Sequence, residues 1–240
     1  MLKQDVYNII NEYAPYETAE NWDCSGWIVD NSKKSVNKVM LCLTVTDNIF
    51  SQAQNENCDL IISHHPLFFV PLKYKGINIL CAHTNLDKAQ GGTTDTLINK
   101  LGLSDYKMSV KNSAETEADE FVRYIKLEKP SNICDFIKLL TIISSDLRYV
   151  NNKNLNTIQK IGFCAGSGSE FISCAQAEGA DAYVTGDLKF HTALESEIVI
   201  FDIGHFESEI PVLEVFKRLL EKKIEIIIAE EKSPFLEIKC

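Results

Sequence analysis

The sequence predicts an α/β protein whose elements fall into two alternating halves. Short apolar runs of strand length alternate with segments in which apolar residues recur at helical spacing. A polar stretch at 105–120 separates an earlier from a later set of such segments. Histidines and carboxylates gather where the predicted strands end, and open α/β sheets bind ligands beyond the carboxyl ends of their strands.

The first half begins with an amphipathic helix. Apolar side chains at Val6, Ile9, Ile10 and Tyr13 share one helix face and predict a helix over 3–13. The further elements expected are a strand at 38–45, a helix from 47 to about 57 capped by Asp47, strands at 59–63 and 77–82, and a helix at 94–101 ended by Gly102.

The second half repeats the alternation. A polar turn is expected at 151–156. The other expected elements are strands at 121–127, 158–165, 181–185, 198–203 and 224–229, a helix at 131–144 capped by Ser131, and helices at 169–178 and 208–222. This pattern is typical of sheets covered by helices.

Composition limits the classes of function. A chain of 240 residues forms one large or two small domains. The net charge of −10 argues against a nucleic-acid binder, which would carry a basic face. It does not exclude an anionic small molecule, because a bound metal reverses the local field. The N-terminus lacks an apolar signal core, and no stretch approaches the roughly 20 apolar residues of a membrane span.

The eight cysteines are predicted to be free thiols. Most lie within apolar strand or helix patterns, and there is no CxxC pair. Buried free thiols are typical of a reducing compartment, so we expect a cytoplasmic protein.

The only five histidines of the chain all lie in or beside segments that resemble metal-ligand loops. His64 and His65 follow a predicted strand and precede Pro66, which favours extended geometry for His65. Adjacent side chains on extended backbone point to opposite sides, so we expect the two rings to serve two neighbouring ions. The alternative is a pair of hydrogen-bonded polar residues at a strand end.

Two more pairs occupy strand exits. His83 is followed by Asp87, and His205 by Glu209. Taken singly, Asp87 could cap a turn and Glu209 could complement a helix dipole. Together the three pairs predict a metal site, because imidazole with carboxylate suits zinc, iron, manganese, nickel or cobalt.

Two other loops follow predicted strands. The first precedes a helix and could hold a phosphate or carboxylate at the helix N-terminus, although it lacks the Walker lysine; a plain tight turn is the alternative. In the second, Asp187 and His191 could orient a ligand or carry protons, or simply belong to a surface loop. The loop that could hold a phosphate or carboxylate consists of Gly166, Ser167, Gly168 and Ser169. No GxSxG nucleophile elbow or His-paired cysteine motif is present, which argues against covalent catalysis.

The chain resembles the NIF-three-like family, also called YbgI-like, whose members carry the name GTP cyclohydrolase I type 2 homologs. The motifs that carry the resemblance span nearly the whole chain. They are Trp22-Asp23-Cys24-Ser25-Gly26, Ile62-Ser63-His64-His65-Pro66, His83-Thr84-Asn85-Leu86-Asp87, Ala165-Gly166-Ser167-Gly168, Thr185-Gly186-Asp187-Leu188-Lys189 and Gly204-His205-Phe206-Glu207-Ser208-Glu209.

The resemblance implies two related α/β domains with mixed sheets, helices packed on them and a metal site at strand ends between the domains. The expected domains are 1–104 with about 205–240, and 105–204. It also implies a toroidal homohexamer whose sites face an inner cavity. Two divalent ions per chain are implied, with His64, His65, Asp87, His205 and Glu209 as ligands and Glu209 as the bridge. His83 and His191 match histidines near the metals.

The chain departs from the family at two points. Cys24 stands where many relatives have Asn, and the inserted middle domain of longer relatives is missing. Neither the polar role of that position nor anything attributed to the inserted domain therefore carries over.

The sequence supports two functional hypotheses. The first is a dinuclear-metal hydrolase of a small nucleotide-like or anionic substrate, in which His83 or His191 carries protons. The second is a metal-binding or partner-binding regulatory protein without turnover. A lone structural metal is a weaker interpretation, because structural zinc prefers closed sets of cysteine and histidine.

Overall fold

Strand–helix alternation produces two five-stranded mixed sheets. The computed structural model describes residues 1–108 and 118–235. The chain divides into two compact units, the first made of Met1–Gly92 and Val212–Lys232, the second of Thr93–Pro211 and Ser233–Cys240. The predicted α/β fold with mixed sheets is confirmed.

The sheet of the first unit has the strand order β1-β4-β3-β2-β10. Four of the strands run parallel, and β1 pairs antiparallel with β4 at one edge. The strands are β1 (Gly26–Val29), β2 (Lys38–Cys42), β3 (Leu60–Ser63), β4 (Asn78–Cys81) and β10 (Glu225–Ile228). All residues of β3 and β4 are buried, which explains why three consecutive apolar residues occur in each strand instead of an alternating pattern.

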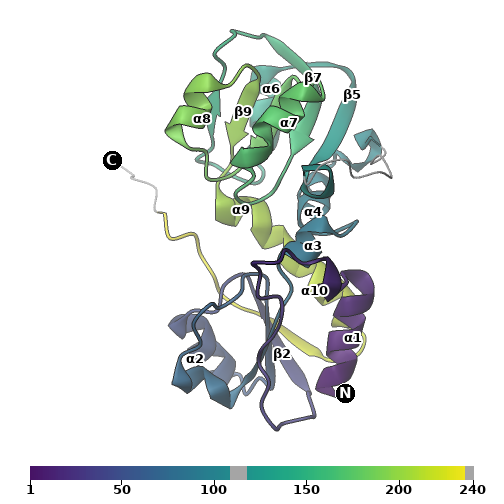
Figure 1. Cartoon of the computed structure of the whole chain (residues 1–240), viewed down its shortest axis with the longest axis vertical. Coiled ribbons are helices and arrows are strands. Elements are labelled where there is room, and N and C mark those ends of the chain that lie inside the picture. The colour runs from purple at the N-terminus through teal and green to yellow at the C-terminus, as the bar shows by residue number, and fades with distance from the viewer. Residues whose placement is uncertain (109–117, 236–240) are drawn as a thin grey trace. The chain divides into compact units, whose positions relative to one another are not determined.

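Helices cover both faces of this sheet (Figure 1). Helix α2 packs Ile49, Phe50 and Ala53 against one face, while α10 packs against β2 and α1 against α10. The helices of the unit are α1 (Lys3–Tyr13), α2 (Asp47–Asn55), α3 (Thr84–Lys88) and α10 (Leu213–Leu220), with 3₁₀ turns at Tyr16–Thr18 and Leu72–Gly76.

The sheet of the second unit has the order β5-β7-β8-β9-β6. Strands β7, β8 and β9 are parallel, and β5 and β6 pair antiparallel at the two edges. The strands are β5 (Arg123–Asn132), β6 (Arg148–Val150), β7 (Thr157–Phe163), β8 (Ala182–Thr185) and β9 (Val199–Asp202).

Alternate side chains of this sheet enter two separate cores. Val184 and Phe201 pack in one core with α4 and α6, whereas Tyr183 and Ile200 pack in the other with α7. The helices are α4 (Thr93–Lys100), α5 (Ala118–Phe121), α6 (Ile133–Leu140), α7 (Ile172–Ala177), α8 (Phe190–Glu195) and α9 (His205–Glu209), with 3₁₀ turns at Ser104–Tyr106, Ser169–Phe171 and Ile210–Val212.

Several local predictions are wrong in detail. The cap of α2 is Thr46, whose hydroxyl accepts from the Ile49 N–H, while Asp47 binds Tyr74 and Lys73. The cap of α6 is likewise Asn132 rather than Ser131. In both cases the residue next to the predicted one has the extended backbone that a cap requires.

One predicted helix is interrupted. The sequence predicts a continuous helix at 208–222, but α9 ends at Glu209 and α10 begins at Leu213. A 3₁₀ turn that contains Pro211 separates them, because proline lacks the N–H that a continuing helix would use. The sequence does not predict the short elements β1, β6, α3 and α8.

The division into units differs from the domain boundaries expected from the sequence. Helix α4 belongs to the second unit, because Leu97 and Ile98 pack in the same core as β7, β8 and β9. Helix α9 belongs to the second unit as well. Among the described residues, no helix is long and apolar enough to cross a membrane.

The thiol prediction can be checked directly. Seven cysteines lie in the described part of the chain and all are free, while Cys240 lies outside it. Burial raises the pKa of the Cys42 and Cys81 thiols well above its ordinary value, which slows their oxidation. We expect thiol titration of denatured protein, without reductant, to find all eight cysteines of the sequence. A titre of six or fewer in freshly prepared protein would reveal a disulfide and contradict the prediction.

Candidate metal centre

Parallel pairing of β3 with β4 brings three histidines of the first unit together. Ser63, the last residue of β3, lies opposite Cys81, the last residue of β4. The Ala82 N–H donates to the Ser63 carbonyl at 3.1 Å and so continues the pairing by one step. His64 and His65 therefore leave the sheet beside His83.

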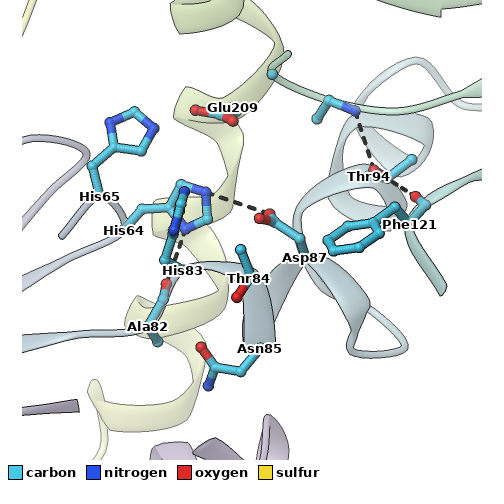
Figure 2. A network of polar contacts seen from close by, with 12 residues as sticks. His64, His65, Ala82, His83, Thr84, Asn85, Asp87, Thr94, Phe121 and Glu209 are labelled. Carbon is cyan, nitrogen blue, oxygen red and sulfur yellow. Dashed lines mark hydrogen bonds and ion pairs between the residues drawn. The ribbon is translucent and has the colours of Figure 1, made fainter. Parts of the chain in front are cut away.

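The three imidazole rings form a cluster (Figure 2). Ring centroids are 5.1 Å apart for His64 and His65, 5.2 Å for His64 and His83, and 5.7 Å for His65 and His83. Each residue offers a ligand atom within 4.8 Å of the other two, so the group could hold a metal ion. The expectation that the rings of His64 and His65 point to opposite sides is wrong, because β3 ends at Ser63 and the chain bends there.

His64 is fully buried and has a defined tautomer. Its Nδ1 lies 2.9 Å from the Ala82 carbonyl oxygen. A carbonyl oxygen can only accept, so Nδ1 carries the proton and Nε2 presents a lone pair in the neutral ring. Nε2 lies 3.4 Å from an Asp87 carboxylate oxygen (Figure 2), so α3 places the predicted carboxylate ligand beside the predicted histidine ligand.

His65 is held through a hydroxyl. Its Nδ1 lies 2.7 Å from Thr44 Oγ1. Thr44 is fixed in turn, since the backbone N–H groups of Leu43 and Thr44 donate to the Glu231 carboxylate at 2.6 and 3.1 Å. The segment after β10 thus fixes the loop after β2 that orients His65.

His83 is held through a carboxylate. Its Nδ1 lies 3.1 Å from Asp23 Oδ1. Burial alone would raise the pKa of Asp23, but hydrogen bonds from His83, Thr84 and Ser25 outweigh it and hold that pKa well below its ordinary value. Metal-binding histidines usually donate their second ring N–H to a carboxylate or carbonyl in this way.

In the second unit, His205 bridges two carboxylates. Its Nδ1 lies 2.7 Å from Asp187 Oδ2, and its Nε2 lies 2.9 Å from Glu209 Oε2, one turn later on α9. Burial alone would lower the pKa of His205, but the hydrogen bonds and charges of Glu209 and Asp187 raise it to about 9. In the absence of metal, His205 is therefore protonated at neutral pH.

Glycines leave room for these side chains. A Cβ on Gly166 would lie 1.9 Å from a Glu209 carboxylate oxygen, and one on Gly186 would lie 2.7 Å from the His205 backbone nitrogen. The Gly166 N–H donates to Ser208 Oγ and the Gly168 N–H to Thr185 Oγ1. Since protein oxygens already engage these two N–H groups, anion binding by the loop stays a prediction that would use its other groups.

The other residues predicted for the site are His191, Ser167 and Ser169. His191 is exposed on α8, where its ring contacts Phe190. Ser167 is exposed, and the Ser169 hydroxyl donates to the Asp187 carbonyl at 3.3 Å. Sequence reasoning gave no role to Asp23 or Thr44, the partners of His83 and His65. The Trp22–Gly26 motif was a signal for Asp23, whereas nothing in the sequence marks Thr44.

A family model matches residues 1–234 of the chain; its description is Duf34/NIF3 (NGG1p interacting factor 3). Among curated relatives, a Clostridium perfringens protein named GTP cyclohydrolase 1 type 2 homolog is 33% identical, with 98% of this chain and 99% of that one covered. A Helicobacter pylori protein named GTP cyclohydrolase 1 type 2 is 31% identical, with 87% of each chain covered.

Solved structures agree on the fold. A structure titled protein ybgI, unknown function, superposes with a TM-score of 0.85 and covers 98% of this chain and 100% of its own. Its sequence is 20% identical to this chain, so this similarity is evidence for the fold alone.

The close approach of Gly166 to Glu209 gives a first test of the second unit. Gly166 has φ +67°, and Gly179 has φ +73°, but a Cβ at Gly179 would meet nothing within 4 Å. Alanine at either position strains the backbone by about 1–2 kcal/mol. We expect Gly166→Ala to lower metal content as well, because its Cβ displaces the Glu209 carboxylate, while Gly179→Ala keeps metal. Atomic emission and thermal unfolding measure the two effects, and equal metal content in both variants would refute the prediction.

The protonated His205 gives a second test. A metal that binds its nitrogen must displace a proton that His205 holds below about pH 9. Affinity should therefore rise with pH up to about 9 and level off above it. Calorimetric titration of metal-free protein in two buffers of different ionisation enthalpy should detect this proton at neutral pH. His205→Gln should release one proton fewer, and an unchanged proton count would contradict the assignment.

Proposed function

We propose that this chain, which belongs to the Duf34/NIF3 family, is a metal-dependent hydrolase of a small anionic or nucleotide-like molecule. One observation carries the proposal most directly. The rings of His64, His65 and His83 cluster, and a carbonyl, a hydroxyl and a carboxylate engage their Nδ1 atoms. Such an arrangement prepares the opposite ring nitrogens for a cation.

The proposed cofactor is two divalent ions per chain, of zinc, iron, manganese, nickel or cobalt. The proposed ligands are His64, His65, Asp87, His205 and Glu209. When bound, such ions lower the pKa of a coordinated water to about 7 and polarise the substrate. The donor set suits this role, since mixed imidazole and carboxylate ligands are typical of catalytic rather than closed structural sites.

The surrounding side chains would prepare and protect this chemistry. The Ala82 carbonyl fixes the tautomer of His64, and Asp187 fixes the ring of His205. His83 would exchange a proton at Nε2, because Asp23 occupies its Nδ1. His191 is a second candidate for proton transfer or substrate contact. Opening of the guanine ring of GTP is one compatible reaction, supported by the names of the relatives; hydrolysis of a phosphoester or amide is another.

A second function, metal-dependent partner binding without turnover, is favoured by one surface feature. Phe68, Phe69 and Leu72, which follow His65, are 63%, 90% and 80% exposed. Grouped exposed apolar side chains mark interaction sites more often than catalytic ones. Whichever function holds, a toroidal hexamer of this chain is the proposed assembly.

Turnover and metal content together separate the two functions. Metal-loaded protein would be incubated with GTP, other nucleotides, phosphoesters and amides. We expect hydrolysis of one class, and we expect Glu209→Gln to lose both metal and activity, because it removes a negative charge between cations. The oligomer should survive this change, as light scattering would show.

His191→Ala is the matched control, since the ring contact described for His191 is to Phe190 and not to a proposed ligand. We expect it to retain metal while turnover or substrate binding falls. Metal loss in His191→Ala, or full occupancy in Glu209→Gln, would mean that the ligands are wrongly assigned. Absence of turnover on every substrate, with metal bound, would favour the partner-binding function.

A further inference from the structure

We propose that His83 is a third nitrogen ligand beside His64 and His65, and that Asp23 is the residue that positions it. This inference rests on the metal centre of the proposed function but not on turnover. It changes the role of His83 from a candidate proton carrier to a ligand, which leaves His191 as the candidate proton carrier. It also gives a role to a carboxylate that the expected ligand set leaves out.

Asp23 is held in a fixed position from which it accepts a hydrogen bond from His83. Its side chain is fully buried, and both of its oxygens are engaged. Oδ1 accepts from the Cys24 N–H at 2.6 Å and from His83 Nδ1 at 3.1 Å. Oδ2 accepts from the Ser25 hydroxyl at 2.7 Å and from the Thr84 N–H and hydroxyl at 3.1 and 2.6 Å. A carboxylate with this many donors stays charged and immobile.

The sheet itself aligns the two residues. Gly26 in β1 lies opposite Cys81 in β4, so the segment before β1 runs beside the segment after β4. The His83 backbone N–H donates to the Ser25 hydroxyl at 3.0 Å. Both the backbone and the ring of His83 are therefore tied to the segment that carries Asp23.

The contacts of His83 fit a ligand better than a structural polar pair. A histidine needed only for packing could direct either nitrogen to its partner. Here Nδ1 faces the carboxylate, and a ring nitrogen of the residue lies within 4.8 Å of ligand atoms of both His64 and His65. Three histidines with an orienting carboxylate behind one of them form a known type of metal site. Asp87, 3.4 Å from His64 Nε2, supplies an anionic group beside the cluster.

The test measures binding of Co²⁺ alone to chelator-stripped, full-length protein, by calorimetry and by the visible absorption of the bound ion. The variants are His83→Ala, Asp23→Asn and the double variant. Asp59→Asn is the matched control, because Asp59 is another buried carboxylate of the first unit that accepts backbone N–H groups, at 2.7 and 3.3 Å. It lies at the other end of β3 from the histidines.

We expect Asp23→Asn to weaken Co²⁺ binding about 10–100-fold, the usual effect of removing a partner of a ligating histidine. His83→Ala should weaken it at least as much and alter the absorption spectrum. Asp23→Asn should cause no further loss in the His83→Ala background, since it acts through that ring. Asp59→Asn should lower the unfolding temperature and leave affinity and spectrum unchanged.

Wild-type affinity and spectrum in His83→Ala would overturn the proposal. So would an Asp23→Asn effect that persists in the His83→Ala background, because Asp23 would then be purely structural. If Asp23→Asn does not fold, His83→Ala and His83→Gln decide the question by spectrum, since His83 is partly exposed and its removal leaves the core intact. If metal-loaded protein turns over no substrate but shows this pattern of Co²⁺ binding, the hydrolase proposal fails and the ligand assignment stands.

Discussion

The pairing of β3 with β4 is the constraint on which the first unit's histidine cluster depends. The register that sets Ser63 opposite Cys81 also sets His64 beside Ala82 and His65 beside His83. A slip of one residue would turn each side chain to the other face of the sheet and separate the rings. The fully buried apolar residues of both strands oppose such a slip, so core packing and site geometry have one cause.

The three rings are oriented by three chemically different acceptors. A main-chain carbonyl holds His64, a hydroxyl holds His65 and a carboxylate holds His83. The carbonyl and carboxylate fix the Nδ1–H tautomer, whereas the hydroxyl can donate or accept and leaves the tautomer of His65 open. A cation would therefore meet two rings of fixed tautomer and one, His65, whose tautomer can change.

The sequence predicted the backbone better than the side-chain network. Apolar runs located β2, β3, β4, β7, β8, β9 and β10 to within a few residues, because burial on both faces leaves a strong signal. Short elements such as β1 and α8 were not predicted, since four to six residues carry little periodicity. The positions of the strand ends predicted that His64, His65 and His83 lie near one another. The predicted directions of the first two rings were wrong, because the strand was expected to continue beyond Ser63. Asp23 and Thr44 act through contacts about 60 and 21 residues away in sequence, which local pattern does not encode.

The second unit reaches a similar result by a different physical route. There the parallel strands β8 and β9 end at Thr185 and Asp202, and the loops beyond them carry Asp187 and His205. The absence of a side chain at Gly166 and Gly186 leaves room for Glu209 and His205, and the spacing of His205 and Glu209 by one helical turn sets the two side chains together. The result is that His205 lies between two carboxylates, which stabilise its protonated form. A metal that binds this ring would replace the proton. The first unit offers rings held by fixed acceptors, whereas the second offers negative charge, and a divalent cation is the ligand that both kinds of site attract.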